Sequence, residues 1–379
     1  MVEVFEISTK KGIREFIDFP RRLYAKEPNY IGELDITVKN KLYARSPFLK
    51  HSEIKLFVAR DKKNNSMLGR IAAIYNNTHI QRHQDSSGFF GFFDCIDDTQ
   101  VSNVLFNKVS HWLMSKGLNN MIGPTNLTTN DSCGLLVKGF EHPNQVNMPY
   151  NYSYYSDLLK ENGFQKVIDL NAYHLVGTPQ FDKYANVMKR AAQRLEKKGV
   201  KIRPMSSKSY HSDIKLLRVA YNKFNEKNWG FMPLNTEEFE HMAKELKSIM
   251  PYDLALIAEK LDEVIGYVIA VPDFNQVLKH IRNGKLLPFG IWKVLKYRKT
   301  IDSSRVMIIG IDDKYRGTGL DLILYRKITD ALHHQKIFQT EAGYVMSTNG
   351  IMNSLILKIG GKPIKKYSLY QKKLANYEC

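Results

Sequence analysis

Hydrophobic and polar residues alternate along the first half of the chain in a pattern typical of strands and helices. Short apolar runs and alternation predict strands at 54–60, 69–74, 88–94, 121–122, 164–170 and 172–176. Apolar residues at helical spacing predict helices at 101–116 and 153–162, the second of them ended by Gly163. Pro179 restricts the residue before it, so we predict a boundary after residue 178.

The second half repeats this order of elements with little identity between the two halves. The pattern predicts helices at 181–198, 211–225, 236–250, 320–334 and 349–359. It predicts strands at 254–259, 264–271, 305–311 and 340–345, and a strand pair within 363–372. We therefore expect a mixed α/β (α+β) chain of two similar domains, 1–178 and 179–379.

Length and composition agree with two globular domains. The chain has 379 residues, of which 43% are hydrophobic and 11% aromatic. It contains no long apolar run that predicts a transmembrane helix, and its first residues lack the apolar segment of a signal peptide. The cysteines Cys95, Cys133 and Cys379 are widely spaced, which predicts reduced thiols and a cytoplasmic location. His333 and His334 are adjacent and share no helix face, so no metal site is expected.

The formal net charge of +18 predicts attraction to an anionic partner. Nucleic acid, a phospholipid surface, an acidic carrier protein and a phosphorylated cofactor all satisfy this charge, as does a solvated basic face without a partner. No helix-turn-helix, zinc or RNP-type pattern favours nucleic acid.

One segment, 306–328, carries a pattern suited to binding phosphate. An apolar strand ends at Ile311, the turn contains Arg316, Gly317, Thr318 and Gly319, and a helix starts at Leu320. Glycines let the backbone approach a ligand, and the N–H groups of a first helical turn favour anions. The turn therefore predicts a pyrophosphate cradle, although a simple tight turn would explain the four residues equally well.

The surrounding pattern resembles motif A of the GCN5-related N-acyltransferases. Arg316 and Gly319 match that motif, whereas Asp321 stands where glycine or alanine is usual. The strand at 340–345 followed by Asn349 resembles motif B, in which the proton-donating tyrosine position is Ile356 here. The resemblance implies two tandem acyltransferase-like domains, each a mostly antiparallel sheet flanked by helices.

Five further segments, 69–74, 88–98, 123–131, 228–234 and 315–325, resemble a bacterial family of fused acyltransferase-like domains whose relatives include bacterial ceramide synthases. This implies transfer of an acyl group from acyl-coenzyme A, or from an acidic acyl carrier protein, to a small-molecule or lipid amine such as a sphingoid base. The departures at Asp321 and Ile356 leave open a degenerate binding module that has lost turnover.

The resemblance also implies roles for particular residues. Backbone groups of Ile309, Gly310 and Ile311 would bind the pantetheine arm and the thioester oxygen, and Asn349 would line the arm. Arg316, Gly317, Thr318, Gly319 and Leu320 would cradle the pyrophosphate.

Three residues are candidates for the general base that deprotonates the amine: Glu226, Asp273 and Tyr344. Each has an alternative interpretation: a solvated loop charge, a turn former after Pro272 and a packing residue, respectively. The chain has no GxSxG nucleophile motif and no cysteine in a recognisably reactive setting.

The first half lacks the glycine cradle. Asp97 and Asp98 open its helix at 101–116, where they would complement the helix dipole and repel phosphate. We therefore expect 1–178 not to bind the cofactor. The polar loop 126–131 is either a substrate contact or a hydrogen-bonded structural loop.

A basic insert separates two strands of the second half. No acidic residue occurs between Asp273 and Asp302, while lysines and arginines alternate there with apolar residues that include Trp292. Such a segment is typical of a peripheral contact with an anionic membrane, here the inner membrane face. The alternative is an insert packed on its own domain with its lysines in water.

Overall fold

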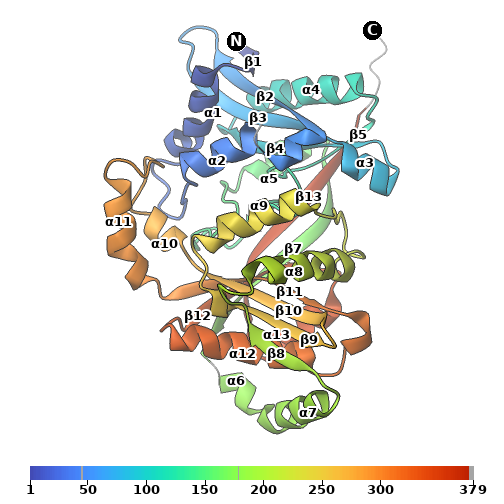
Figure 1. Cartoon of the computed structure of the whole chain (residues 1–379). Coiled ribbons are helices and arrows are strands. Elements are labelled where there is room, and N and C mark those ends of the chain that lie inside the picture. The colour runs from blue at the N-terminus through green and yellow to red at the C-terminus, as the bar shows by residue number, and fades with distance from the viewer. Residues whose placement is uncertain (44–45, 178, 375–379) are drawn as a thin grey trace. The chain divides into compact units, whose positions relative to one another are not determined.

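The computed structural model describes residues 1–43, 46–177 and 179–374, and the chain forms two compact units. Unit 1 comprises Met1–Asp169, Val277–Lys296 and Lys365–Cys379, and unit 2 comprises Leu170–Gln276 and Tyr297–Ile364. Each unit combines helices with a mostly antiparallel sheet, which confirms the predicted fold class (Figure 1). The bounds of these units differ from a single division of the chain at residue 178, which lies outside the described residues. Separate domains 1–178 and 179–379 stay a prediction.

The sheet of unit 1 has the order β1-β2-β3-β4-β5-β13, with β6 also paired to β13. Its strands are β1 (Val2–Ile7), β2 (Ser52–Asp61), β3 (Met67–Asn76), β4 (Ser87–Cys95), β5 (Asn120–Gly123), β6 (Leu135–Lys138) and β13 (Lys362–Lys373). The β4–β5 pair is parallel and the others are antiparallel. The last strand of the chain thus completes the sheet built by the first half.

The helices of unit 1 begin and pack as local chemistry dictates. They are α1 (Lys10–Leu23), α2 (Asp35–Leu42), α3 (Asn77–His83), α4 (Thr99–Ser115), α5 (Tyr155–Glu161) and α11 (Gly290–Tyr297), with a 3₁₀ turn at Pro47–Lys50. In α4, Val101, Leu105 and Val109 recur every four residues and are fully buried. Asp98 caps α4 by accepting the N–H groups of Gln100 and Val101, at 2.8 and 3.3 Å.

Unit 2 has a sheet of the order β7-β12-β11-β10-β9-β8. Its strands are β7 (Gln165–Val176), β8 (Lys201–Pro204), β9 (Ala255–Lys260), β10 (Glu263–Pro272), β11 (Ser303–Ile311) and β12 (Gln339–Met346). Among the pairs of these described strands, β11 with β12 is parallel and the others are antiparallel. From Leu170 onward, β7 pairs with β12, so the strand that ends the first half belongs to this sheet.

Helices cover both faces of the unit 2 sheet (Figure 1). They are α6 (Pro179–Asp182), α7 (Ala185–Lys197), α8 (Tyr210–Phe224), α9 (Thr236–Lys247), α10 (Asn275–Leu278), α12 (Leu320–His334) and α13 (Gly350–Lys358), with 3₁₀ turns at Tyr252–Leu254, Arg298–Thr300 and Asp313–Tyr315. Strand β9 shows the arrangement: Leu256 and Ala258 join the core under α7, α12 and α13. Ala255 and Ile257 join the core under α8 and α9, so a strand without polar alternation is buried on both sides.

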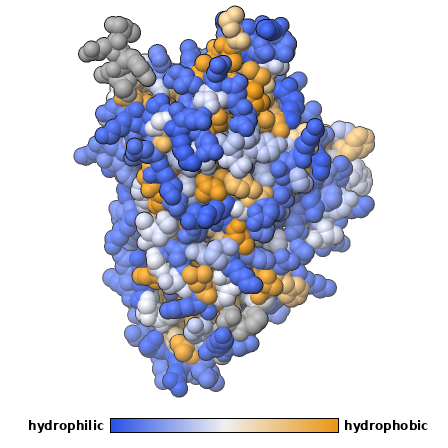
Figure 2. Space-filling model, turned by 180° about the vertical axis from the view of Figure 1, so that it is seen from behind, coloured by the Kyte–Doolittle hydropathy of each residue, from blue (hydrophilic) through white to orange (hydrophobic). Residues whose placement is uncertain are grey.

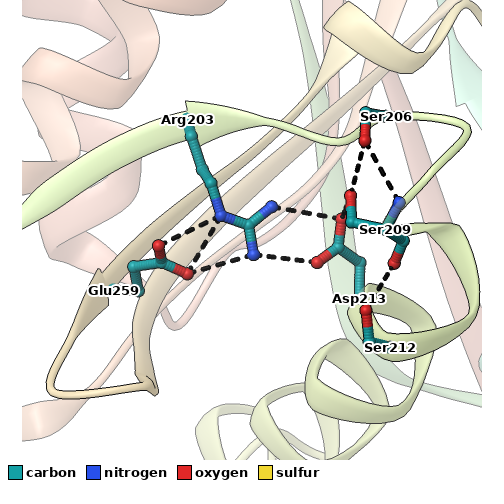
Figure 3. Close-up of polar contacts among 6 residues, drawn as sticks. All are labelled: Arg203, Ser206, Ser209, Ser212, Asp213 and Glu259. Carbon is teal, nitrogen blue, oxygen red and sulfur yellow. Dashed lines mark hydrogen bonds and ion pairs between the residues drawn. The ribbon is translucent and has the colours of Figure 1, made fainter.

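An ion pair between a partly exposed arginine and a buried carboxylate ties α8 to the edge of this sheet (Figure 3). Arg203 of β8 donates to both carboxylate oxygens of Asp213 on α8, at 2.8 and 3.2 Å, and its Nε donates to Glu259 of β9 at 3.1 Å. Ser209 also donates to Asp213 at 2.7 Å. Asp213 is fully buried, and this bidentate pairing satisfies its charge.

Several predicted elements differ from those observed. Strand β7 is continuous where two strands, 164–170 and 172–176, were expected, and β13 is one strand rather than a pair within 363–372. The predicted helix at 181–198 is the short α6 followed by α7. The pattern did not predict β1, α1, α2, α3, β6, β8, α10 or α11, whereas α12 spans the predicted 320–334. In the described residues, no helix has the length and apolarity needed to cross a bilayer.

Candidate functional site

The parallel strands β11 and β12 separate partway along their length. Their pairing runs from Ser303 opposite Gln339 to Val306 opposite Ala342, and the described strands show no pairing beyond it. β11 continues to Ile311 along β10, while β12 continues to Met346 along β7. On its β12 side, β11 therefore has backbone N–H and C=O groups over 307–311 that are not paired with another strand. A ligand with an extended, amide-containing arm binds through such groups.

A bulge in β11 lies where this separation starts. Ile308 is opposite Ile269 and Val306 is opposite Ala270, so Met307 is an extra residue in the ladder. Bulges bend a strand and re-aim its backbone groups. The bulge thus directs the predicted residues Ile309, Gly310 and Ile311 into the part of β11 that leaves β12.

Gly310 makes room for a buried tyrosine next to this strand. A Cβ at Gly310 would lie 2.5 Å from Cζ and 2.7 Å from Oη of Tyr267 on β10. Asn225 donates to that Oη at 3.0 Å, and Asn228 donates to Asn225 at 3.0 Å. Burial raises the pKa of Tyr267, so its hydroxyl is neutral at physiological pH. Sequence reasoning missed this polar group because Tyr267 lies in an otherwise apolar strand.

Two carboxylates in the segment after β11 pair with lysines. Asp312 pairs with Lys223 of α8 at 2.7 Å and accepts the N–H of Lys314 at 3.0 Å. Burial works against its ionisation, but these partners outweigh it and lower the pKa of Asp312. Asp313 pairs with Lys227 at 2.6 Å, which lowers the pKa of Asp313. The Asp312–Lys223 pair, whose carboxylate is buried, holds the turn against the end of α8, while the exposed Asp313–Lys227 pair adds little.

The predicted pyrophosphate turn has the backbone that its glycines allow. Gly317 and Gly319 have φ angles of +72° and +88°, in the left-handed region that favours glycine. A Cβ at Gly317 would meet no atom within 4 Å, so this part of the turn is open. The side chain of Thr318 donates to Tyr315 O at 2.6 Å, while Arg194 donates to Thr318 O at 3.1 Å. The open turn thus lies beside the cation of Arg194.

The side chain of Arg316 is half-exposed and engaged within the turn. Arg316 contacts Asp313 at 3.0 Å, with about half of each side chain exposed. Such an exposed pair is worth little and exchanges readily. Arg316 can therefore leave Asp313 for a phosphate at small cost.

The first turn of α12 already contains an acceptor. Gly319 is the N-cap, and the fully buried Leu320 side chain anchors the helix in the core. Asp321 accepts the N–H of Leu322 at 2.9 Å. This carboxylate uses a donor that a phosphate would otherwise take, and it repels an anion at the same helix end. The departure from motif A at Asp321 thus has a local consequence.

Asn349 and Ile356 have structural roles in α13. Asn349 is exposed and caps the helix by accepting the N–H of Met352 at 3.1 Å, and Ile356 is fully buried in the core. Sequence reasoning missed Asn353, which donates to Met346 O at 2.8 Å and accepts from Tyr173 Oη at 2.5 Å. Asn353 therefore ties the end of β12 to α13 and β7.

Tyr344 lies on β12 just beyond the point of separation. Arg305 of β11 donates from Nε to Gly343 O at 3.0 Å, and its guanidinium lies 5.3 Å from the centre of the Tyr344 ring. Arg305 is buried and stands opposite the equally buried Glu341 in the β11–β12 register. Sequence reasoning did not single out either charge, because both lie inside strands.

Glu226 is exposed in the loop after α8. Its neighbours in sequence make contacts there: Asn225 with Tyr267, and Lys227 with Asp313. The structure thus brings Glu226, Tyr344, Ile309–Ile311 and the turn at 316–319 to the carboxyl ends of β11 and β12.

Asp273 lies at the opposite end of β11. Its N–H donates to Ser303 O at 2.8 Å, next to the start of that strand, and its carboxylate accepts the N–H of Asn275 at 3.3 Å. At about 3.3 Å per residue, Asp273 is roughly 20 Å from Ile309 along the strand. The structure therefore does not bring Asp273 together with Glu226 and Tyr344, and its position is that of a turn former after β10.

The donor set fits an acyl thioester that carries a phosphorylated tail. The unpaired edge of β11 suits the amide-containing arm, the open turn at Gly317 suits phosphate, and Arg194, Lys314 and Arg316 supply cations nearby. Across the described residues, no three His, Cys, Asp or Glu side chains gather as metal ligands would.

Comparison with known proteins shows two relatives that span nearly the whole chain. Protein YghO of Escherichia coli (strain K12) is 32% identical over 372 residues, covering 96% of this chain and 94% of that protein. The Bacterial ceramide synthase of Caulobacter vibrioides (strain NA1000 / CB15N) is 31% identical over 382 residues, covering 98% of each. The chain matches no family model.

Solved structures share the fold at low identity. A tandem GNAT protein from the clavulanic acid biosynthesis pathway aligns over 100% of both chains with a TM-score of 0.58 and 9% identity. A GCN5-related glucosamine N-acetyltransferase region of a fungal GH3 β-N-acetylglucosaminidase aligns with a TM-score of 0.58 and 13% identity, over 98% of this chain and 38% of that one.

Proposed function

This chain belongs to the GCN5-related N-acyltransferase superfamily, in the same family as the Bacterial ceramide synthase, and on that premise we propose that it moves an acyl group from acyl-coenzyme A to an amine. It is an acyltransferase enzyme, and an N-acyltransferase in kind. We choose acyl-coenzyme A as the donor because β11 and β12 separate after Val306 and Ala342, and the open glycine turn follows the end of β11.

The reaction needs positioning and charge stabilisation more than a nucleophilic side chain. The amine nitrogen attacks the thioester carbonyl carbon, a C–N bond forms, and the C–S bond breaks. Backbone N–H groups in Ile309–Ile311 stabilise the oxyanion that develops on the carbonyl oxygen. The amine loses a proton to a base, for which Glu226 and Tyr344 are the candidates at this end of the sheet, and the departing thiolate gains one.

Asp321 bears on how tightly the donor is held. Because its carboxylate accepts the N–H of Leu322, coenzyme A binding requires Asp321 to turn aside or the phosphate to bind through fewer helix donors. An acidic acyl carrier protein, which presents one phosphate rather than a nucleotide tail, is the alternative donor. The degenerate binding module stays the competing hypothesis, motivated by Asp321 and by Ile356 in the core.

We propose a long-chain, sphingoid-type amine as the acceptor. The support is the name of the relative from Caulobacter vibrioides, which is 31% identical over 98% of this chain.

The test is a product assay with paired donors and acceptors. Purified protein is incubated with palmitoyl-coenzyme A or palmitoyl carrier protein and with sphinganine, a peptide amine or a soluble polyamine. Free thiol and amide product are quantified together. We expect equal amounts of thiol and amide, with sphinganine preferred. Thiol release without amide, or no release with any pair, would contradict the proposal and favour the binding module.

A further inference from the structure

A run of large apolar side chains is exposed on α11 and the turn before it. We call residues 277–296, which belong to unit 1, the α11 segment. Its exposed apolar residues and their exposed fractions are Leu287 73%, Phe289 75%, Ile291 46%, Trp292 70% and Leu295 53%. On the face of the molecule seen in Figure 2, hydrophilic residues predominate and hydrophobic residues are scattered in small areas. Neighbouring exposed apolar residues of this size mark an interaction surface.

Cations surround these apolar side chains. The α11 segment contains no Asp or Glu, and its exposed basic residues are Lys279, Arg282, Lys285, Lys293 and Lys296. Burial and the neighbouring Lys279, Lys293 and Lys296 together lower the pKa of His280. The segment therefore presents a positive field beside an apolar surface.

The segment is held in place on unit 1. Asp35 N–H donates to Gly284 O at 2.9 Å, and a Cβ at Gly284 would lie 2.0 Å from Nη2 of Arg21. Lys293 Nζ donates to His280 O at 2.8 Å. These contacts hold the segment in place, so the exposed Phe289 and Trp292 belong to an ordered surface.

We propose that the α11 segment docks on an anionic lipid bilayer, with Phe289, Trp292 and Leu295 entering the interface and the cations contacting lipid phosphates. Trp292 and Leu295 are three residues apart and so share a helix face. At 1.5 Å per residue, the helix Gly290–Tyr297 is about 12 Å long, so it lies in the interface and does not span.

A bilayer fits this surface better than an acidic protein does. Side chains about 70% exposed project outward and do not line a groove, so a protein partner would need a matching pocket for each of them. A bilayer accepts apolar side chains at any position, and anionic headgroups complement the cations. The inference rests on this surface alone and does not depend on the proposed reaction.

The test is vesicle binding by the full chain. Sedimentation with phosphatidylglycerol vesicles and with phosphatidylcholine vesicles is compared for three variants and the wild type. The apolar variant is F289S/W292S/L295S, and the basic variant is R282S/K285S/K296S. The matched control, K189S/R190S/K197S, removes the same charge from exposed positions of α7, which belongs to unit 2. Far-UV circular dichroism verifies that each variant folds.

We expect wild type and control to bind phosphatidylglycerol at low salt, and both other variants to lose at least tenfold in affinity. Each cation near an anionic surface contributes about fivefold. Turnover of a soluble amine should be unchanged in all variants. An equal loss in the control would overturn the proposal, because binding would then follow net charge. Binding of an acidic carrier protein that needs these residues, without vesicle binding, would assign the surface to a protein partner.

A second readout reports insertion directly. The chain has three tryptophans, Trp112, Trp229 and Trp292. In a W112F/W229F variant, Trp292 is the sole indole, and its emission should shift to shorter wavelength on phosphatidylglycerol and be quenched by brominated acyl chains. Bound protein with an unshifted, unquenched Trp292 would overturn the docking geometry.

Discussion

Gly310 is a position on β11 where a methyl group has no room. Its Cβ would lie 2.5 Å from the ring of Tyr267, which is fully buried. We predict that Gly310→Ala costs about 1–3 kcal/mol of unfolding free energy through overpacking. Urea unfolding measures this cost. Adding Tyr267→Ala should make the Gly310→Ala change nearly neutral, and an equal cost in both backgrounds would show that the ring is not the cause.

Asp321 sets the affinity for the donor if the phosphate binds at α12. Replacing it with Asn keeps an oxygen for the N–H of Leu322, bonded at 2.9 Å, and removes the negative charge. A charge at a helix N-terminus is worth about 0.3–1 kcal/mol, so we predict about two- to fivefold tighter binding of coenzyme A by calorimetry. Asp330→Asn, near the other end of the same helix, is the control and should leave the affinity for coenzyme A unchanged. Unchanged or weaker binding by Asp321→Asn would place the phosphate elsewhere.

Among single residues, the sequence indicated the backbone of the site better than its side chains. Gly317 and Gly319 were recognisable because a turn before a helix requires their conformation. Tyr267, Asn225 and Asn353 were not, because their roles depend on strands and helices that pack together from distant parts of the chain. Asp273 resembled a base in sequence, but only the strand register shows which end of the sheet it occupies.

At the scale of elements, α8 is tied to β8 and β9 through one guanidinium (Figure 3). Removing Arg203 takes the charged partner away from the buried Asp213 and leaves its hydrogen bond from Ser209. We predict that Arg203→Ala lowers the unfolding free energy by about 1–3 kcal/mol, since a buried carboxylate then loses its charged hydrogen-bond donor. Arg203→Lys should recover part of it, because the charge returns without the bidentate geometry. A loss below about 0.5 kcal/mol would contradict this account.

The turn after β11 should respond to acid. The pKa of Asp312 is lower in the folded protein than in the unfolded chain, so its pair with Lys223 contributes stability that is present above about pH 4. That stability is lost as the pH falls through the lowered pKa. We predict that Asp312→Asn shows a smaller loss of thermal stability between pH 5 and 3 than wild type. Parallel profiles would show that Asp312 contributes nothing.

Element boundaries followed the sequence where caps and periodicity agree. α12 begins after Gly319 and has buried residues along one face, so both signals gave the same limits. The prediction divided β7 at the polar Asn171 and took the β13 region as a strand pair. Ladder pairing along each strand overrides the local signal.

At the scale of the whole molecule, the two halves exchange their last strands. β13 pairs with β5 and β6 of unit 1, and β7 pairs from Leu170 onward with β12 of unit 2. We predict that ending the chain at Gly361 destabilises unit 1, although its other strands remain. Hydrogen exchange should then rise severalfold in β5 and β6. Unchanged protection in those strands would contradict a structural role for β13.

The sequence predicted the repeat of two mixed α/β halves but not this exchange. Periodicity reports which residues form a strand and says little about its partner, because strand pairing joins segments far apart in the chain. The net charge of +18 likewise predicted an anionic partner without locating it, and the exposed apolar residues of α11 now indicate one surface.

The central claim is that the thioester binds along β11 where it leaves β12. A crystal structure with a non-hydrolysable palmitoyl-coenzyme A thioether tests it most directly. The account predicts ligand density along 307–311, with the pyrophosphate at the turn of Gly317 and Arg316 turned away from Asp313. Density confined to another part of the chain, or a 307–311 edge filled by protein in the complex, would contradict it.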